Sequence, residues 1–394
     1  MARRQVLLAI LFGAGLGIAL GVFLIVQVAS SNHAQPTPTP SNNSFVAQAS
    51  PSPHPTATET TVSPTATATP RPSTPTRTPT RAPTSSADVR AIQPSILLRG
   101  LRHEYQKFNN CGPTTLAMNL SYFGRKDTQA DVAAITKPNP QDKNVRPDEM
   151  AAYASRVGLR TIIRVNGTFD QLQALLSNDI PVIIETGLVK EPQGWMGHYR
   201  LVIGYDTMQI TTMDSYDGPS VKITYADVDT LWRQFNRLYI VIYSPQQETL
   251  VRAILGDARD DQTMYAQAVA RARVEIERDA QDAFARFNLG SSLVGLKRYA
   301  EAATEFDRAR AQGLPWRMMW YQFEPFEAYL QTKQYDKTIA LANEILSKAT
   351  DLEEAYYYKG LALRGLGREA EARQAFETAL KYNPNYNDAQ RALK

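Results

Sequence analysis

The stretch YQKFNNCGPTTLAMNLSYFG, residues 105–124, contains the features that decide the fold. Cys111 is followed by Gly112 and Pro113, and then by apolar residues with helical spacing. Proline suits the first turn of a helix, so we expect Cys111 at a helix N-terminus. The helix dipole and the unpaired backbone N–H groups favour a thiolate at such a position. A nucleophilic cysteine would be placed here, and it is the chain's only cysteine.

A thiol nucleophile needs a base and a group that orients the base. His103 and His198 are the two histidines outside the proline-rich N-terminal region. His198 opens HYRLVIGYD, whose alternating pattern predicts a half-buried strand that would hold the base rigidly. The next expected strand, residues 208–213, ends at Asp214, an acid that could orient the imidazole.

The oxyanion of an acyl-transfer reaction needs hydrogen-bond donors. Gln106 lies five residues before Cys111, and its amide could act there together with the Cys111 backbone N–H.

Each of these residues also has a simpler interpretation. Cys111 could be a small buried apolar residue, and His198 a hydrogen-bonded strand histidine. Asp206 and Asp217 lie near Asp214 in a region where turn aspartates are common. Gln106 could be a surface glutamine, and His103 remains a reserve base.

These motifs resemble the bacteriocin-leader (double-glycine) peptidase superfamily, and more narrowly its stand-alone C39-like peptidase domains. The resemblance is carried by Gln106, by Cys111-Gly112-Pro113-Thr114, by Gly197-His198-Tyr199 leading to Gly204-Tyr205-Asp206, and by Asp214.

The resemblance covers roughly residues 95–245 and implies an α+β papain-like cysteine peptidase domain. It implies a nucleophile at Cys111, a base at His198, an orienting acid at Asp214 and an oxyanion donor at Gln106. No metal or organic cofactor is implied. The sequence shows neither the six-helix membrane domain nor the P-loop ATPase of leader-processing exporters.

Local patterns predict further elements of this domain. Residues 146–157 and 168–176 have helical patterns, and residues 180–185 read as a short buried strand. The segment KEPQGWMG, residues 190–197, reads as a loop, in which Trp195 either walls the substrate cleft or packs in the core.

The C-terminal part is helical and internally repeated. Gly290, Ala302 and Ala309 recur with identical offsets as Gly360, Ala372 and Ala379, at about two tetratricopeptide periods. Tyr265, Tyr299 and Tyr335 are expected at equivalent turns between helices. The pattern resembles tetratricopeptide repeats over roughly residues 249–386. It implies an all-α superhelix that either recruits a protein partner or only packs against the peptidase domain.

The N-terminal end predicts a membrane anchor. Arg3 and Arg4 precede an uncharged apolar run from Val6 to Val28, long enough for a transmembrane helix with the following domains outside the cytoplasm. Small residues at 29–31 leave signal cleavage, and hence a secreted form, as an alternative. The next segment, to about residue 88, is rich in Pro, Thr and Ser and reads as a disordered stalk.

Charge excludes one class of partner. The net charge is only +4, part of it in the N-terminal and stalk arginines, so a clustered basic face for nucleic acid is not supported. The expected partners are a peptide or protein substrate, a protein bound by the repeats, and the membrane.

The expected organisation is an anchor (residues 1–31), a stalk (32–88), a papain-like cysteine peptidase domain (89–247) and tetratricopeptide-type repeats (248–394). Three hypotheses remain open. The domain is an extracytoplasmic cysteine peptidase, or an idle peptidase-like domain in a surface binding scaffold, or an amidase or transferase acting on cell-wall peptide with the same residues.

Overall fold

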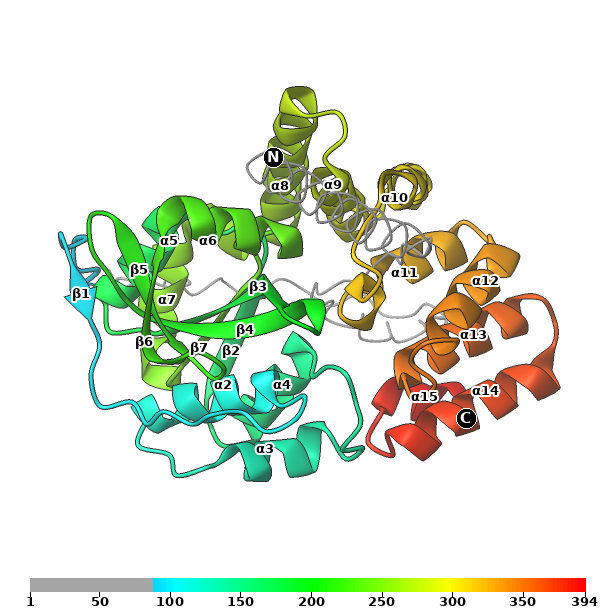
Figure 1. Ribbon diagram of the computed structural model, residues 1–394, viewed down its shortest axis with the longest axis horizontal. Coiled ribbons are helices and arrows are strands. Elements are labelled where there is room, and N and C mark those ends of the chain that lie inside the picture. The colour runs from blue at the N-terminus through cyan, green and yellow to red at the C-terminus, as the bar shows by residue number, and fades with distance from the viewer. Residues whose placement is uncertain (1–87) are drawn as a thin grey trace, which may run out of the picture.

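The computed structural model describes residues 88–394, which form a peptidase-like domain and a curved helical array (Figure 1). The anchor and most of the stalk expected from the sequence lie outside these residues. Within the described part, no helix is both long and apolar enough to cross a membrane.

Three helices follow the first short strand, β1 (Ile96–Leu97). They are α2 (Cys111–Tyr122), α3 (Gln129–Thr136) and α4 (Pro147–Arg156). The prediction of a helix at 146–157 is confirmed, with Pro147 in its first turn. Thr128 caps α3 by accepting the N–H of Asp131, while the Asp131 side chain returns to the Thr128 N–H.

A seven-stranded antiparallel sheet forms the centre of the domain, in the order β2-β7-β3-β4-β5-β6, with β1 also paired to β4. The remaining strands are β2 (Arg160–Arg164), β3 (Val182–Lys190), β4 (Gly194–Tyr205), β5 (Gln209–Asp214), β6 (Gly218–Thr224) and β7 (Tyr239–Tyr243).

The prediction of a loop at 190–197 is wrong for most of its length. Strands β3 and β4 continue as a hairpin in which Lys190 pairs with Gly194, so only residues 191–193 form the turn. The outer half of this hairpin is packed and not exposed: Gly187 lies against Gln234, and Gly197 lies against Phe235 and Tyr321, the last of these a residue of the helical array.

Two cores lie on opposite faces of the sheet. On one face, α2 and α4 pack on Tyr199, Leu201 and Ile203 of β4. On the other face, β4 contributes Val202 and Tyr205 to a core that also contains α5 (Phe169–Ser177), α6 (Tyr225–Trp232) and α7 (Glu248–Leu255). The helix predicted at 168–176 is confirmed by α5. Helix α7 packs in the core of the peptidase-like domain although it follows residue 247.

The C-terminal array begins with α8 (Asp261–Arg278). Its other α-helices are α9 (Ala283–Gly295), α10 (Tyr299–Gln312), α11 (Glu324–Gln331), α12 (Tyr335–Leu346), α13 (Glu353–Gly365), α14 (Glu369–Tyr382) and α15 (Asn387–Ala392). Four short 3₁₀ segments also occur in the described chain: η1 (Arg233–Phe235), η2 (Pro245–Gln247), η3 (Gly256–Arg259) and η4 (Met318–Trp320).

Small residues pack the paired helices of a repeat together, as the sequence predicts. A Cβ on Gly290 would come within 2.6 Å of Phe306, and one on Gly360 within 2.5 Å of Phe376. No side chain larger than hydrogen fits at either position. The phenylalanine of the second helix therefore packs directly on the glycine of the first helix in each pair.

The prediction that three tyrosines lie at equivalent turns between helices is confirmed in part. Tyr299 and Tyr335 begin α10 and α12, but Tyr265 lies inside α8 and not at a turn. Its packing is nevertheless equivalent, because Tyr265 contacts Gly295 as Tyr335 contacts Gly365. The helix simply starts one turn earlier, at the Asp260 cap.

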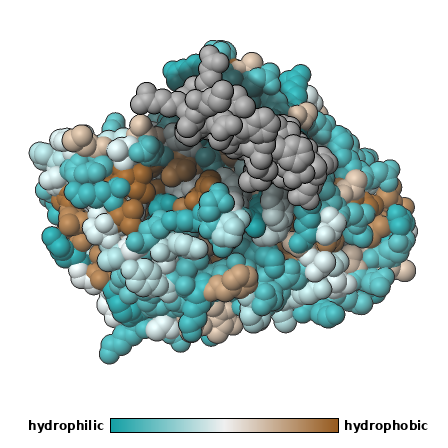
Figure 2. All heavy atoms as spheres, viewed as in Figure 1, coloured by the Kyte–Doolittle hydropathy of each residue, from teal (hydrophilic) through white to brown (hydrophobic). Residues whose placement is uncertain are grey.

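The array curves around the peptidase-like domain and contacts it at both ends and in the middle (Figure 1). Arg271 of α8 donates to the Gly167 carbonyl (3.0 Å), Asn288 of α9 to the Arg233 carbonyl (2.7 Å), and Asn385 to the Ile135 carbonyl (3.1 Å). On the face seen in Figure 2 the surface is mainly hydrophilic, with apolar side chains in separate patches.

Candidate active site

Helix α2 places Cys111 at the place that the sequence predicts, the first residue of the helix. The helix is oriented by Thr115, whose hydroxyl donates to the Tyr199 carbonyl of β4 at 3.2 Å. A Cβ on Gly112 would lie 3.1 Å from Val145, so glycine lets the helix start settle against the following segment. The N-terminal N–H groups of a helix have no intrahelical partners and stay available.

Cys111 as a whole residue is partly exposed, but its sulfur atom is closely packed. Burial raises the pKa of the Cys111 thiol to about 11, and the negative charge of Glu185 adds to this. The backbone N–H groups of Tyr199 and Gly112 act in the opposite direction. The thiol is therefore protonated at neutral pH, which differs from the thiolate that the helix position alone suggested. Packing around the sulfur outweighs the helix N-terminus.

His198 and Asp214 are brought together as predicted. Nε2 of His198 lies 2.9 Å from Oδ1 of Asp214, and both side chains are at most 1% exposed. The carboxylate accepts the Nε2–H, which leaves Nδ1 as the basic nitrogen. Asp206 and Asp217 do not take this role: Asp206 binds Met208 and Gln209 in a turn, and Asp217 pairs with Lys190.

Asp214 is held by more donors than the sequence indicated. Arg200 forms an ion pair with its second oxygen and also donates to Thr186 at 3.2 Å. The Tyr216 N–H donates to Oδ1 at 2.7 Å. Burial would raise the pKa of Asp214, but His198, Arg200 and the Tyr216 N–H together hold it well below its usual range.

Arg200 was missed by the sequence analysis although a signal existed. Residues two apart on a strand share a face. Arg200 therefore lies on the same face of β4 as His198, and a charged residue in an otherwise apolar strand needs a counter-charge.

Gln106 lies beside the His198–Asp214 pair. Its backbone N–H donates to the Ser215 carbonyl (2.8 Å), and its side-chain Oε1 accepts from the Ser215 hydroxyl (2.9 Å). With Oε1 engaged, the Nε2 amide remains as the donor that an oxyanion would use. Ser215 is thus a second residue that the sequence analysis missed, directly after Asp214.

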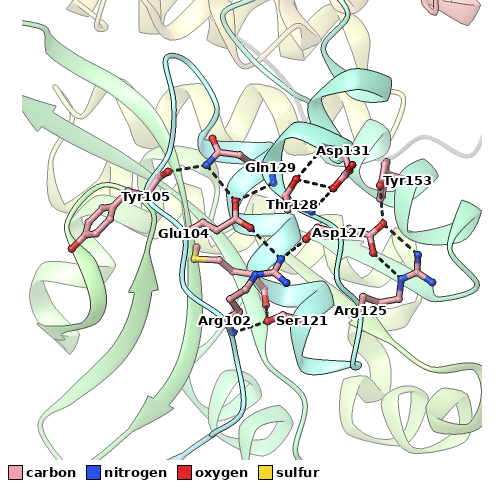
Figure 3. Close-up of polar contacts among 11 residues, drawn as sticks. Arg102, Glu104, Tyr105, Ser121, Arg125, Asp127, Thr128, Gln129, Asp131 and Tyr153 are labelled. Atoms are coloured by element: carbon pink, nitrogen blue, oxygen red, sulfur yellow. Dashed lines mark hydrogen bonds and ion pairs between the residues drawn. The ribbon is translucent and has the colours of Figure 1, made fainter.

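The chain segment that carries Gln106 is fixed by one glutamine of α3 (Figure 3). Gln129 donates to the Tyr105 carbonyl (2.8 Å) and accepts from the Lys107 N–H (2.8 Å), the two residues that flank Gln106. Glu104 in turn accepts from the Gln129 N–H at 3.1 Å. The backbone on both sides of Gln106 is therefore tied to the start of α3.

His103, the reserve base, has a different position. Its Nε2 lies 2.8 Å from the Asp214 carbonyl oxygen, and its ring meets Tyr105 edge-on. It therefore supports the main chain at Asp214.

The nearest described link between the nucleophile and the base is the backbone of β4. Tyr199, whose N–H faces the Cys111 sulfur, is the residue that follows His198. Among the described residues, the hydrogen bond of the imidazole goes to Asp214, and none joins it to the thiol. Catalytic hydrogen bonds are often long in unliganded enzymes and tighten when substrate binds.

The helical array contributes to the surroundings of the site. Tyr321 is buried in the same core as Tyr199, with its ring 2.9 Å from where a Cβ on Gly197 would lie. The Trp195 ring stacks on Phe235 (5.9 Å) and meets Tyr321 edge-on. Of the two interpretations of Trp195, packing is the one observed. No cluster of three or more metal-ligating side chains occurs within residues 88–394.

The domain before the helical repeat array therefore holds a cysteine at a helix start, a buried His–Asp pair on neighbouring strands and a fixed glutamine. Residues 99–244 match the model of the Peptidase_C39 like family, and residues 353–386 match the tetratricopeptide repeat. The chain thus joins a C39-like peptidase domain to tetratricopeptide repeats.

Similar solved structures include proteins that match each part of the chain. A putative C39-like peptidase from Bacillus anthracis is 17% identical, with 39% of this chain and 98% of that chain covered and a TM-score of 0.32. The peptidase domain of Streptococcus ComA, a bifunctional ABC transporter of a quorum-sensing pathway, is 17% identical, with 37% and 99% covered and a TM-score of 0.31. MamA (41-end) from Desulfovibrio magneticus RS-1 is 20% identical, with 34% and 82% covered and a TM-score of 0.28. None of the curated proteins matches the chain.

Proposed function

We propose that the chain is an extracytoplasmic cysteine peptidase in which Cys111 attacks the carbonyl carbon of a peptide bond. The observation that carries this proposal is the buried pair of His198 on β4 and Asp214 on β5, 2.9 Å apart. The residue after His198, Tyr199, turns its backbone N–H toward the Cys111 sulfur.

The resting thiol is protonated, so the reaction begins with proton transfer. His198 Nδ1 takes the thiol proton as Sγ bonds to the carbonyl carbon, and Asp214 stabilises the imidazolium. The oxyanion accepts hydrogen bonds from Gln106 Nε2 and the Cys111 N–H. The imidazolium then protonates the leaving amine, and water, deprotonated by His198, hydrolyses the thioester.

The test is a peptide-library digestion by the full chain, read by mass spectrometry. We expect cleavage that is lost in Cys111→Ala and reduced at least about a thousand-fold in His198→Ala, as removal of a nucleophile or its base does elsewhere. Asp217→Asn is the matched control, since that carboxylate pairs with Lys190 at the surface. Cleavage that persists in Cys111→Ala would refute the proposal.

A second candidate is an idle peptidase-like domain in a binding scaffold. It is favoured by the raised pKa of the Cys111 thiol and by the contacts of the array with the domain. Absence of any cleavage, together with a Cys111 alkylation rate that is indifferent to His198→Ala, would support it. A transferase would instead pass the acyl group to an added amine, and an amidase would hydrolyse an amide bond of cell-wall peptide with water as the acceptor.

The location and the partners are part of the proposal. We propose that Val6–Val28 anchors the chain in the cytoplasmic membrane with the later domains outside, because Arg3 and Arg4 flank an apolar run of spanning length. Digestion of the C-terminal domains by protease added to spheroplasts tests this, and protection would contradict it. We further propose that the repeats bring a protein or peptide to the domain that they contact.

A further inference from the structure

A pocket of about 370 Å³ opens beside Gln106. Three separate segments form it, namely the chain before Cys111, the β3–β4 hairpin and the turn after Asp214. Its lining includes Tyr105, Lys107, Phe108, Met196, Ser215 and Tyr216. Pockets of a few hundred Å³ suit a small ligand or one large side chain with its adjoining backbone.

The pocket borders the turn that follows Asp214, next to the base. Its wall includes Ser215 and Tyr216, which directly follow Asp214, and the Tyr216 ring meets the His198 ring edge-on with centroids 6.4 Å apart. The imidazolium of His198 is the group that protonates the leaving amine. A side chain in this pocket therefore belongs to the residue that follows the cleaved bond.

The chemistry of the lining selects an apolar side chain. Phe108 is 69% exposed and Tyr105 64% exposed at the rim, and Met196 and Tyr216 supply further apolar surface. The lining contains one cation, Lys107, and no carboxylate. Burial of an apolar or aromatic side chain covers this surface, whereas a basic side chain would find no counter-charge.

The walls are held in place before any ligand binds. Gln129 ties the backbone at Tyr105 and Lys107, and Lys190 lies 5.3 Å above the Tyr216 ring while paired with Asp217. From the array, Arg317 donates to the Trp195 carbonyl at 3.3 Å and also to that of Gln193 in the hairpin turn. A preformed pocket of this kind loses little freedom on binding.

We propose that this pocket is the subsite for a large apolar, preferentially aromatic, side chain of the substrate residue that follows the cleaved bond. The position of this residue relative to the cleaved bond rests on the proposed peptidase function. The affinity of the pocket for an apolar side chain can be measured without catalysis.

The first experiment uses the full chain as Cys111→Ala and product-like peptides with N-terminal Phe, Gly or Lys, titrated by calorimetry. We expect the Phe peptide to bind roughly tenfold or more tightly than the Gly peptide. The Lys peptide should bind no better than the Gly peptide. Equal affinity for Phe and Gly, or a preference for Lys, overturns the subsite.

Matched variants locate the binding. Phe108→Ser, at the rim, should remove most of the preference for Phe, while Met208→Ser, at a side chain that is 74% exposed and outside the lining, should leave it unchanged. Both positions are exposed, so neither change should unfold the chain. A preference that survives Phe108→Ser, or is lost in Met208→Ser, overturns the assignment.

Cleavage by the unmodified chain separates this inference from the proposed function. Cleavage with no preference after the bond overturns the subsite and leaves the peptidase intact. Binding preference for Phe without any cleavage overturns the peptidase and leaves an aromatic-side-chain pocket.

Discussion

Arg200 places a guanidinium against the Asp214 carboxylate that is hydrogen-bonded to His198, and this residue adds a buried cation to the proposed triad. The Asp214 carboxylate is shared between the His198 imidazole and a permanent cation, both buried. Its negative charge is therefore largely compensated before the imidazole is protonated, which weakens its pull on the proton.

Arg200→Met tests this balance. With the compensating charge gone, Asp214 should favour imidazolium, so the acid limb of the pH profile for kcat/KM, where the base becomes protonated, should move to higher pH. Loss of one partner of a buried pair should also cost about 3 kcal/mol of unfolding free energy. Arg200→Lys is the control that keeps the charge. An unshifted pH profile in a folded Arg200→Met chain would contradict the argument.

The Cys111 thiol should titrate above the free value. Because burial raises its pKa to about 11, the iodoacetamide alkylation rate should rise through an inflection well above the ordinary value of about 8.5. The chain has no other cysteine, so the rate reports on this residue alone. An inflection below pH 8 would show a preformed thiolate and contradict the packing argument.

At the scale of elements, helix α3 fixes the position of the chain segment around Gln106, which precedes it in the sequence. Gln129 begins α3 and forms hydrogen bonds to the residues on both sides of Gln106, so the capped helix start fixes the segment that carries the proposed oxyanion donor.

Gln129→Met keeps the size of the side chain and removes these bonds. We expect kcat/KM to fall about tenfold as the donor loses its fixed position, with about 1 kcal/mol lost in stability. Gln141→Met, at an exposed side chain, is the control. Unchanged kcat/KM with reduced stability would mean that Gln129 has only a structural role.

At the scale of the whole molecule, the last repeat meets the peptidase domain through buried acids. Arg146 lies 3.4 Å from Glu354 of α13, and Lys143 pairs with Asp351 at 2.8 Å. Burial raises the pKa values of the nearby carboxyls Asp142, Glu149, Glu353 and Glu354. This contact therefore favours protonated carboxyls.

Stability should consequently depend on pH. For Glu149, burial raises the pKa from 4.5 to about 7, so the folded chain binds more protons than the unfolded chain between these values. This contribution is full below pH 4.5 and is lost as pH rises through 7. We expect denaturant unfolding to give about 2 kcal/mol less stability at pH 8 than at pH 5 from this group.

Glu149→Gln should flatten that dependence, because glutamine does not titrate. The fold should survive the change, since glutamine can still accept the Arg146 N–H as Glu149 does at 2.9 Å. Glu377→Gln, on an exposed position of α14, should not change it. A Glu149→Gln chain whose stability falls between pH 5 and pH 8 as much as that of the Glu377→Gln chain would contradict the assignment.

Much of the molecule was accessible from the sequence because its signals are local. The Cys111-Gly112-Pro113 helix start, the alternation after His198 and the glycine–alanine repeats each depend on residues close in the chain. These patterns specified the C39-like domain, the repeat array, and the pairing of His198 with the acid that ends the next strand.

Tertiary structure decided the rest. The raised pKa of Cys111, the role of Arg200, the clamp of Gln129 on Gln106 and the wrapping of the repeats around the domain all join residues distant in sequence. Periodicity shows which face of an element is buried, but not what it is buried against. The electrostatic state of a buried group depends on those neighbours, so it could be assigned only once the chain had folded.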